Sequence, residues 1–282
     1  MDIKDTRTKY RIGMYLRWAA KSLIKANLAV LSRIWRSVRG GADINNIHIL
    51  MYHRINDYRK NEMSVPVREF RKQVAWLKKT GFQNMRMAEL ESTRLPPECP
   101  RVIFSFDDGY EDNYSEAFPI LKEFGYSAIF YIPYELIGQR GMYPRDLMES
   151  GRPEHNRIMD WRHVRHLHEN DMEIGSHSLS HPILTKMGDG GAKREITESK
   201  IKIENKLGSR ITSFCYPGGC FNKKHIRWVR EAGYRSACTT RIGCYRGESL
   251  YSVPRIAVLA SDSFFIFKQK MLGDKKMFSL IH

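Results

Sequence analysis

The chain has no uninterrupted apolar run of bilayer length, a deficit of acidic residues, and no cysteine pair in a C-x-x-C arrangement. Near the N-terminus, charges such as Lys21 and Lys25 interrupt every window that a spanning helix would need. The same charges break the apolar stretch that a secretory signal requires, and no small-residue cleavage site follows. We therefore expect neither a membrane-spanning helix nor an export signal.

The five cysteines are few and odd in number, which does not fit a disulfide framework. A reducing compartment is the simpler expectation. A bridge between Cys215 and Cys220 is disfavoured, because a cysteine beside a buried strand usually behaves as a small apolar residue.

The shortage of acids leaves a strongly basic chain, with 47 Lys and Arg against 31 Asp and Glu and a net charge of +16. Such a charge predicts an anionic partner: membrane phospholipid, a phosphate-bearing lipid-linked sugar, or nucleic acid. Aromatic residues are not interleaved with the basic ones as a stacking platform, and no nucleic-acid motif is present. We therefore expect no nucleic-acid partner.

Much of the positive charge lies in residues 1–45, a segment that differs in character from the rest of the chain. At 100° per residue its apolar side chains share one face and its basic ones the other, which predicts an amphipathic helix that ends at Gly40 and Gly41. The helix could pack against the rest of the chain or lie on anionic lipid, with Trp18 and Trp35 as interfacial anchors. We expect residues 46–282 to form one domain, since 282 residues with 42% hydrophobic content suit a single core.

Short apolar strands alternate with helical patterns along residues 46–282, which is typical of an α/β barrel. Strands are expected near residues 47–55, 101–106, 127–131, 172–174, 214–216, 237–239 and 251–258. Helices are expected after Pro66 up to Gly81, over 113–124, from 161 onward, over 190–207 and over 225–232. The loop over 138–157 is long enough to form a lid or a substrate wall.

Two adjacent carboxylates, Asp107 and Asp108, follow the expected strand 101–106, and Gly109 permits a sharp turn there. Like charges in contact cannot both stay ionised unless a cation or hydrogen bonds compensate. The pair therefore indicates a bound cation, although a solvated turn is the alternative.

A second polar stretch follows the expected strand 172–174, where GSHSLSHP separates His177 from His181 by three residues. This spacing puts both imidazoles on one side, and a carboxylate from another strand would complete a three-ligand site with an open position for water. Two structural histidines are the alternative reading.

Together, SFDDG (Ser105 to Gly109), HSLSH (His177 to His181) and FCYPGG (Phe214 to Gly219) resemble the three motifs of the polysaccharide deacetylases, the NodB-homology group. The resemblance covers roughly Ile47 to Leu272. It implies a distorted barrel of parallel strands with outer helices. It also implies a divalent metal, zinc first, with cobalt, nickel or manganese as alternatives, that drives removal of N-acetyl groups from amino sugars.

Carried over by resemblance, Asp108, His177 and His181 are the metal ligands, and Asp107 is the catalytic base. Tyr52 and His53 resemble the start of a circularly permuted subgroup that deacetylates poly-N-acetylglucosamine, in which this histidine is the catalytic acid. A polar cap at a strand end is the alternative for a lone histidine.

Five further residues are expected to bind or orient substrate: Asp160, Trp161, Tyr216, Gly218 and Arg255. Asp160 either orients a catalytic group or caps a helix, and Trp161 either stacks on a sugar or packs in the core. The N–H near Gly218 is expected to face the oxyanion. The third motif lacks the arginine usual in the family, since Cys215 and Tyr216 precede Pro217, and Arg255 is expected to supply that charge beside Asp107.

The sequence thus predicts a metal-dependent deacetylase for an N-acetylated amino sugar, in a bacterial surface glycan or an undecaprenyl-phosphate-linked precursor. The expected location is the cytoplasmic face of the inner membrane, with the cytoplasm as the alternative. A hydrolase of small cyclic amides or esters on the same scaffold is the second function considered.

Overall fold

The computed structural model describes residues 46–57, 62–139, 143 and 156–272. Within them, parallel strands form one sheet in the order β1-β10-β9-β8-β7-β6-β5-β4. Seven of these strands close into a barrel, because β1 pairs with β10 on one side and with β5 on the other. The barrel strands are β1 (Ile47–Tyr52), β5 (Arg101–Phe106), β6 (Ala128–Ile132), β7 (Glu173–Ser176), β8 (Ser213–Cys215), β9 (Ser236–Ile242) and β10 (Val253–Ala257).

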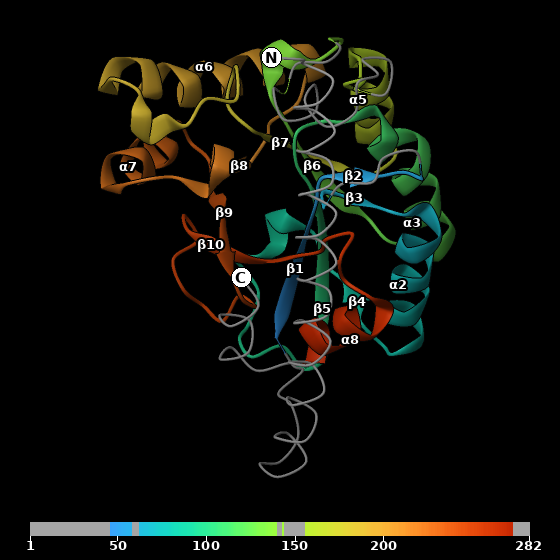
Figure 1. The fold of residues 1–282 in the computed structure, drawn as a ribbon. Helices are drawn as coiled ribbons and strands as arrows, with labels where there is room; N and C mark the ends of the chain where they lie inside the picture. The colour runs from blue at the N-terminus through green and yellow to red at the C-terminus, as the bar shows by residue number, and fades with distance from the viewer. Residues whose placement is uncertain (1–45, 58–61, 140–142, 144–155, 273–282) are drawn as a thin grey trace, which may run out of the picture.

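Helices surround this barrel (Figure 1). They are α2 (Val67–Lys79), α3 (Phe118–Phe124), α5 (Trp161–Glu169), α6 (Asp189–Leu207), α7 (Lys223–Glu231) and α8 (Phe264–Leu272). The described residues also form three short strands: β4 (Gln83–Asn84) pairs with the start of β5, and β2 (Arg54–Ile55) pairs with β3 (Ser64–Val65).

The two faces of each strand pack into different cores, as the two-residue repeat of a strand requires. In β6, Phe130 and Ile132 join the large cluster that includes residues of the outer helices. Ile129 and Tyr131 of the same strand join a smaller cluster with residues of β1, β5, β8, β9 and β10. Both faces of the barrel wall are therefore apolar, which explains the nearly continuous hydrophobic strands in the sequence.

The expected α/β barrel is confirmed, with two local differences. The helix expected over 113–124 starts as a π-helical turn, Asn113–Ala117, in which the Phe118 N–H bonds to the Asn113 carbonyl. Pro119 follows, and it has no N–H to donate to the carbonyl four residues earlier, which favours the wider turn. Helix α8 was not expected. The predicted helix in residues 1–45 and most of the 138–157 loop lie outside the described residues.

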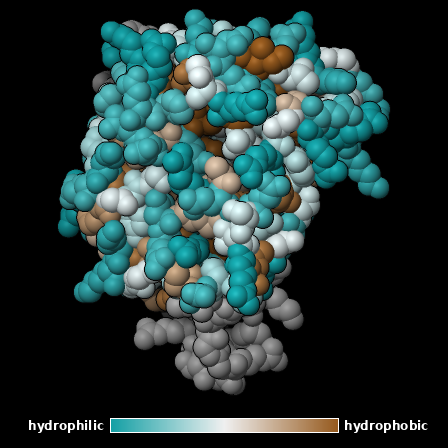
Figure 2. Space-filling view, turned by 180° about the vertical axis from the view of Figure 1, so that it is seen from behind, coloured by the Kyte–Doolittle hydropathy of each residue, from teal (hydrophilic) through white to brown (hydrophobic). Residues whose placement is uncertain are grey.

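Among the described residues, no helix is both long and apolar enough to cross a membrane. All five cysteines are free. In the part of the chain that the structure describes, one large hydrophobic side chain is exposed: Ile201 of α6 has an exposed fraction of 57%. Seen from behind, hydrophobic residues form separate small areas among hydrophilic ones (Figure 2). The described residues therefore present no broad apolar surface on this face.

Candidate metal centre

The Asp-Asp-Gly turn lies at the carboxyl end of β5 and is buried, with Asp107 2% exposed and Asp108 8% exposed. Asp108 has a φ of 72°, in the left-handed region that side chains rarely adopt. The Tyr143 hydroxyl donates to the Asp108 carbonyl at 3.0 Å, and the Asp107 N–H donates to the carbonyl of Tyr52 in β1 at 3.0 Å. Such a backbone is retained where surrounding contacts fix it, typically at functional sites.

The loop after β7, His177 to His181, is called the histidine loop. It brings both imidazoles to the Asp108 carboxylate. The Nε2 atoms of His177 and His181 lie 3.4 and 3.2 Å from Asp108 Oδ1. On its other side, His177 Nδ1 bonds to the Cys215 carbonyl at 2.8 Å. A carbonyl only accepts, so Nδ1 carries the proton and the Nε2 lone pair is left for a ligand.

These residues fit a divalent cation. One ligand atom each from Asp108, His177 and His181 lies within 4.8 Å of the others. Two imidazoles and one carboxylate form a donor set typical of catalytic zinc, with a fourth position for water. Burial raises the pKa of Asp108, but the hydrogen bonds with the two imidazoles outweigh it and hold this pKa well below its usual range. The carboxylate is therefore ionised at neutral pH, as a metal ligand must be.

A second group of possible ligands, Asp107, His177 and Cys215, is equally compact but chemically less suited. Burial raises the pKa of the Cys215 thiol well above its usual range, so the thiolate needed for metal binding is disfavoured. Both Asp107 oxygens accept from the Arg255 guanidinium, whose positive charge disfavours a second cation at the same carboxylate. The cluster around Asp108 is therefore the better cation site.

Arg255 lies where the sequence predicts it, beside Asp107. Its Nη1 and Nη2 atoms donate to Asp107 Oδ1 and Oδ2, each at 2.7 Å, and its Nε donates to the Thr239 carbonyl at 3.0 Å. Burial raises the pKa of Asp107, but the Arg255 charge and hydrogen bonds outweigh it and lower this pKa. Cys215 lies against the same guanidinium, and its Sγ accepts from Arg255 Nη2 at 3.1 Å.

His53 follows β1 and belongs to the same electrostatic environment. Burial lowers the pKa of its imidazole below its usual value, and the charges of Asp108 and Asp107 offset this only in part. The His53 carbonyl accepts from the Asn113 side chain at 2.9 Å, which ties its backbone to the segment after the Asp-Asp-Gly turn. Its role as catalytic acid stays a prediction.

Among the expected substrate residues, Asp160 and Trp161 start α5. The Asp160 carboxylate accepts from the backbone N–H groups of Arg162 and His163, so it caps this helix. The Trp161 ring contacts Tyr134 at 5.4 Å between centroids, and the Tyr134 N–H donates to the Ser178 carbonyl. Tyr134 thus links Trp161 to the histidine loop.

The two expected residues of the third motif differ in exposure. Tyr216 is fully buried, and its hydroxyl donates to the Tyr251 carbonyl at 3.2 Å. We therefore do not assign Tyr216 to the site. Gly218 is exposed and has a φ of 61°. A Cβ added there would lie 2.9 Å from the side chain of Ile183, two residues after the histidine loop. Only glycine fits this position without strain.

Three residues at the site were not foreseen as such in the sequence: Tyr143, Cys215 as a partner of Arg255, and Glu195. Glu195 lies in α6 and accepts three hydrogen bonds from the histidine loop. A glutamate at an inward position of an otherwise ordinary charged helix was the signal that could have indicated it.

Comparison with known proteins agrees with this geometry. A sequence profile described as Polysaccharide deacetylase matches residues 94–237, which include the Asp-Asp-Gly turn, the histidine loop and the third motif. The chain belongs to the polysaccharide deacetylase family. Membership assigns this deacetylase to the hydrolases of amide bonds.

Curated relatives of the deacetylase include bacterial proteins of similar and of greater length. YxkH of Bacillus subtilis, named for polysaccharide deacetylation, is 28% identical over 216 residues, covering 74% of this chain and 70% of YxkH. The poly-beta-1,6-N-acetyl-D-glucosamine N-deacetylase of Staphylococcus epidermidis is 23% identical over 241 residues, covering 78% of this chain and 81% of that enzyme. The Escherichia coli enzyme of the same name is 23% identical, and the match spans only 39% of its length.

Solved structures show the same fold. The deacetylase PplD of Streptococcus pyogenes, determined in complex with acetate, matches with a TM-score of 0.68 and 24% identity, covering 80% of this deacetylase and 98% of PplD. IcaB from Ammonifex degensii matches with a TM-score of 0.69 and 20% identity, covering 82% and 98% of the two chains. The shared fold confirms the NodB-type barrel expected from the motifs.

Proposed function

We propose that this deacetylase removes N-acetyl groups from N-acetylated amino sugars, in a bacterial surface glycan or a lipid-linked precursor, and releases acetate. The observation that carries the proposal is the position of Asp108, His177 and His181 around one point, with the Arg255-bound Asp107 next to them in sequence and space. The names of the poly-N-acetylglucosamine deacetylases among its relatives support a glucosamine polymer as the first substrate to test.

Asp108, His177 and His181 would hold the divalent cation, for which zinc fits the donor set best. When bound, such a cation polarises the amide carbonyl and lowers the pKa of water to about 7. Asp107 does not belong to this ligand set, and Arg255 keeps it ionised. A carboxylate oxygen has two lone pairs, so Asp107 can accept a proton from water while it accepts from Arg255.

The departing amine is a poor leaving group until it is protonated. His53 is assigned as the donor of that proton, since its imidazole lies close enough to Asp107 and Asp108 for their charges to act on its pKa. After β8, the backbone N–H near Gly218 is assigned to the oxyanion, because glycine permits close approach there. Trp161 is assigned to the sugar face, because its ring contacts Tyr134, which in turn bonds to Ser178 of the histidine loop.

The test is acetate release by the purified full chain. Substrates are free N-acetylglucosamine oligomers, poly-β-1,6-N-acetylglucosamine and an undecaprenyl-phosphate-linked N-acetylated sugar, each assayed after chelation and after zinc, cobalt, nickel or manganese is restored. We expect release only with metal. Absence of release from all three, with hydrolysis of small cyclic amides or esters retained, would replace this proposal with the second function.

We also propose that the enzyme acts at the cytoplasmic face of the inner membrane, attracted to anionic lipid by its net charge of +16. Sedimentation with vesicles tests this. Binding to phosphatidylglycerol vesicles that weakens with added salt supports the proposal, and equal recovery with neutral phosphatidylcholine vesicles contradicts it.

A further inference from the structure

Glu195 is a buried carboxylate of α6 whose hydrogen bonds all reach into the histidine loop. Its Oε2 accepts from the Leu179 N–H at 2.8 Å and the Ser180 N–H at 2.9 Å, and its Oε1 accepts from the Ser180 hydroxyl at 2.8 Å. The residue is 5% exposed. One side chain therefore satisfies three donors in the short span between His177 and His181.

This span has an unusual backbone that needs such support. Ser178 and His181 have φ values of 69° and 61°, in the left-handed region. Inside the loop, Ser178 Oγ accepts from the His181 N–H at 3.0 Å, and Ser176 Oγ accepts from the Ser178 N–H at 3.2 Å. Backbone conformations of this kind persist only where surrounding contacts fix them. The N–H groups of Leu179 and Ser180 bond outside the loop, and Glu195 is the acceptor for both.

We propose that Glu195 is a positioning residue that holds the two imidazoles in ligating geometry and thereby sets the affinity of the site for a divalent cation. The inference rests on the proposed metal site, not on the identity of the substrate. Residues that orient metal ligands through hydrogen bonds commonly change metal affinity when they are replaced. Here the orientation acts on the loop backbone, because the described contacts of Glu195 go to Leu179 and Ser180 and not to the rings.

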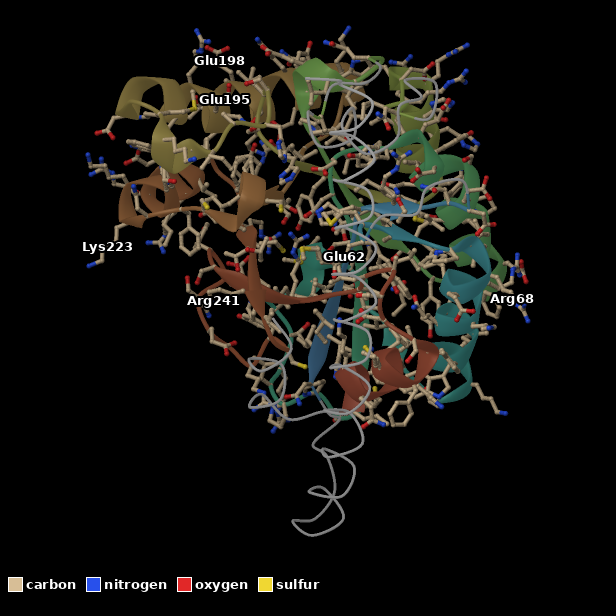
Figure 3. All side chains as sticks on the ribbon, in the orientation of Figure 1. Glu62, Arg68, Glu195, Glu198, Lys223 and Arg241 are labelled. Carbon is tan, nitrogen blue, oxygen red and sulfur yellow. The ribbon has the colours of Figure 1, made fainter. Side chains whose placement is uncertain are left out.

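A matched control lies one turn further along the same helix. Glu198 is also a glutamate of α6, and its carboxylate pairs with Lys202 at 3.4 Å with both side chains about 41% exposed. Both glutamates are labelled in Figure 3, where Glu198 lies farther out than Glu195. E198Q removes the same charge from α6 and leaves the histidine loop untouched.

The experiment measures zinc affinity of the full chain by competition with a chromophoric chelator, without substrate. We expect E195A to raise the zinc dissociation constant about 10- to 100-fold, as replacement of supporting residues does elsewhere. E195Q should raise it less, because a rotated amide can accept from both N–H groups and donate to the Ser180 hydroxyl. E198Q should leave the dissociation constant unchanged. The visible spectrum of the cobalt-loaded protein should change in E195A and not in E198Q.

The outcomes separate this inference from the proposed function. Wild-type protein that binds no cation contradicts the metal site itself. Wild-type protein that binds zinc, together with E195A of unchanged affinity and cobalt spectrum, contradicts only the role of Glu195. Should E195A fail to fold by circular dichroism, E195D decides, because its shorter side chain draws the carboxylate away from Leu179 and Ser180, and unchanged zinc affinity in E195D overturns the inference.

Discussion

Arg255 and Asp107 form a two-point ion pair inside the barrel, with both N···O distances at 2.7 Å. Both side chains are almost completely buried, at 0% and 3% exposure. Arg255 lies in β10 and Asp107 directly follows β5, and these two strands lie on either side of β1. Arg255, from a strand late in the chain, thus supplies the positive charge beside Asp107.

Arg255→Met should destabilise the fold strongly, because Asp107 would remain buried without its partner. Loss of one partner of a buried ion pair costs about 3–5 kcal/mol. Urea unfolding measures this change. The surface pair of Arg71 and Glu123 provides the control, since both side chains are about half exposed and Arg71→Met should cost at most about 1 kcal/mol. Equal losses in the two variants would contradict a structural role for the Arg255–Asp107 pair.

Asp107→Asn and His177→Ala should separate the base from the ligands. Asp107→Asn should abolish acetate release and keep the metal, because Asp107 is outside the proposed ligand set. His177→Ala should lose the metal, since it removes one of three ligands. Metal content by elemental analysis, measured beside turnover, distinguishes them. An active Asp107→Asn variant would show that the base is assigned wrongly.

Much of this arrangement could be predicted from sequence because the site residues follow strands of a parallel barrel, whose carboxyl ends meet at one mouth. The sequence predicts Asp107, Asp108, His177 and His181 on that basis and from the family motifs. It does not predict the depth of Tyr216, since strand alternation after a short β8 is ambiguous by one residue. It also does not reveal Glu195, because a glutamate in a charged helix looks solvent-exposed until the helix docks on the loop.

His53→Ala should affect substrates according to their leaving group. If His53 protonates the departing amine, this variant loses amide hydrolysis by a factor of about 10² to 10⁴, as loss of a general acid does. Hydrolysis of an aryl acetate should fall much less, because a phenolate leaves without a proton. Both rates are measured on the same zinc-loaded preparation. Parallel losses on the two substrates would indicate that His53 supports the site in another way.

Asp160 should make α5 sensitive to acid. Burial raises the pKa of Asp160, but the bonds with Arg162 and with the helix N-terminus outweigh it and lower this pKa to about 2, from 3.8. The folded state thus holds the proton less tightly than the unfolded state, so the stabilisation is present above about pH 4 and is lost as the pH falls towards 2. Asp160→Asn should keep the cap and remove this part of the pH dependence, whereas Asp160→Ala should cost about 1 kcal/mol at pH 7. Denaturant titrations at pH 3 and pH 7 measure both effects, and identical pH dependence in wild type and Asp160→Asn would refute the assignment.

Gly218→Ala tests the oxyanion assignment against backbone strain alone. Gly218 has a φ of 61° and Gly208, which ends α6, has a φ of 68°, so alanine is disfavoured at both positions by about 1 kcal/mol. An added Cβ meets Ile183 at position 218 and nothing within 4 Å at position 208. Both variants should therefore lose stability. Only Gly218→Ala should lower kcat for acetate release, because of these two glycines only Gly218 lies against Ile183, two residues after the histidine loop. If Gly208→Ala lowers kcat equally, strain accounts for the loss; if Gly218→Ala keeps the wild-type kcat, the N–H near this turn does not face the oxyanion.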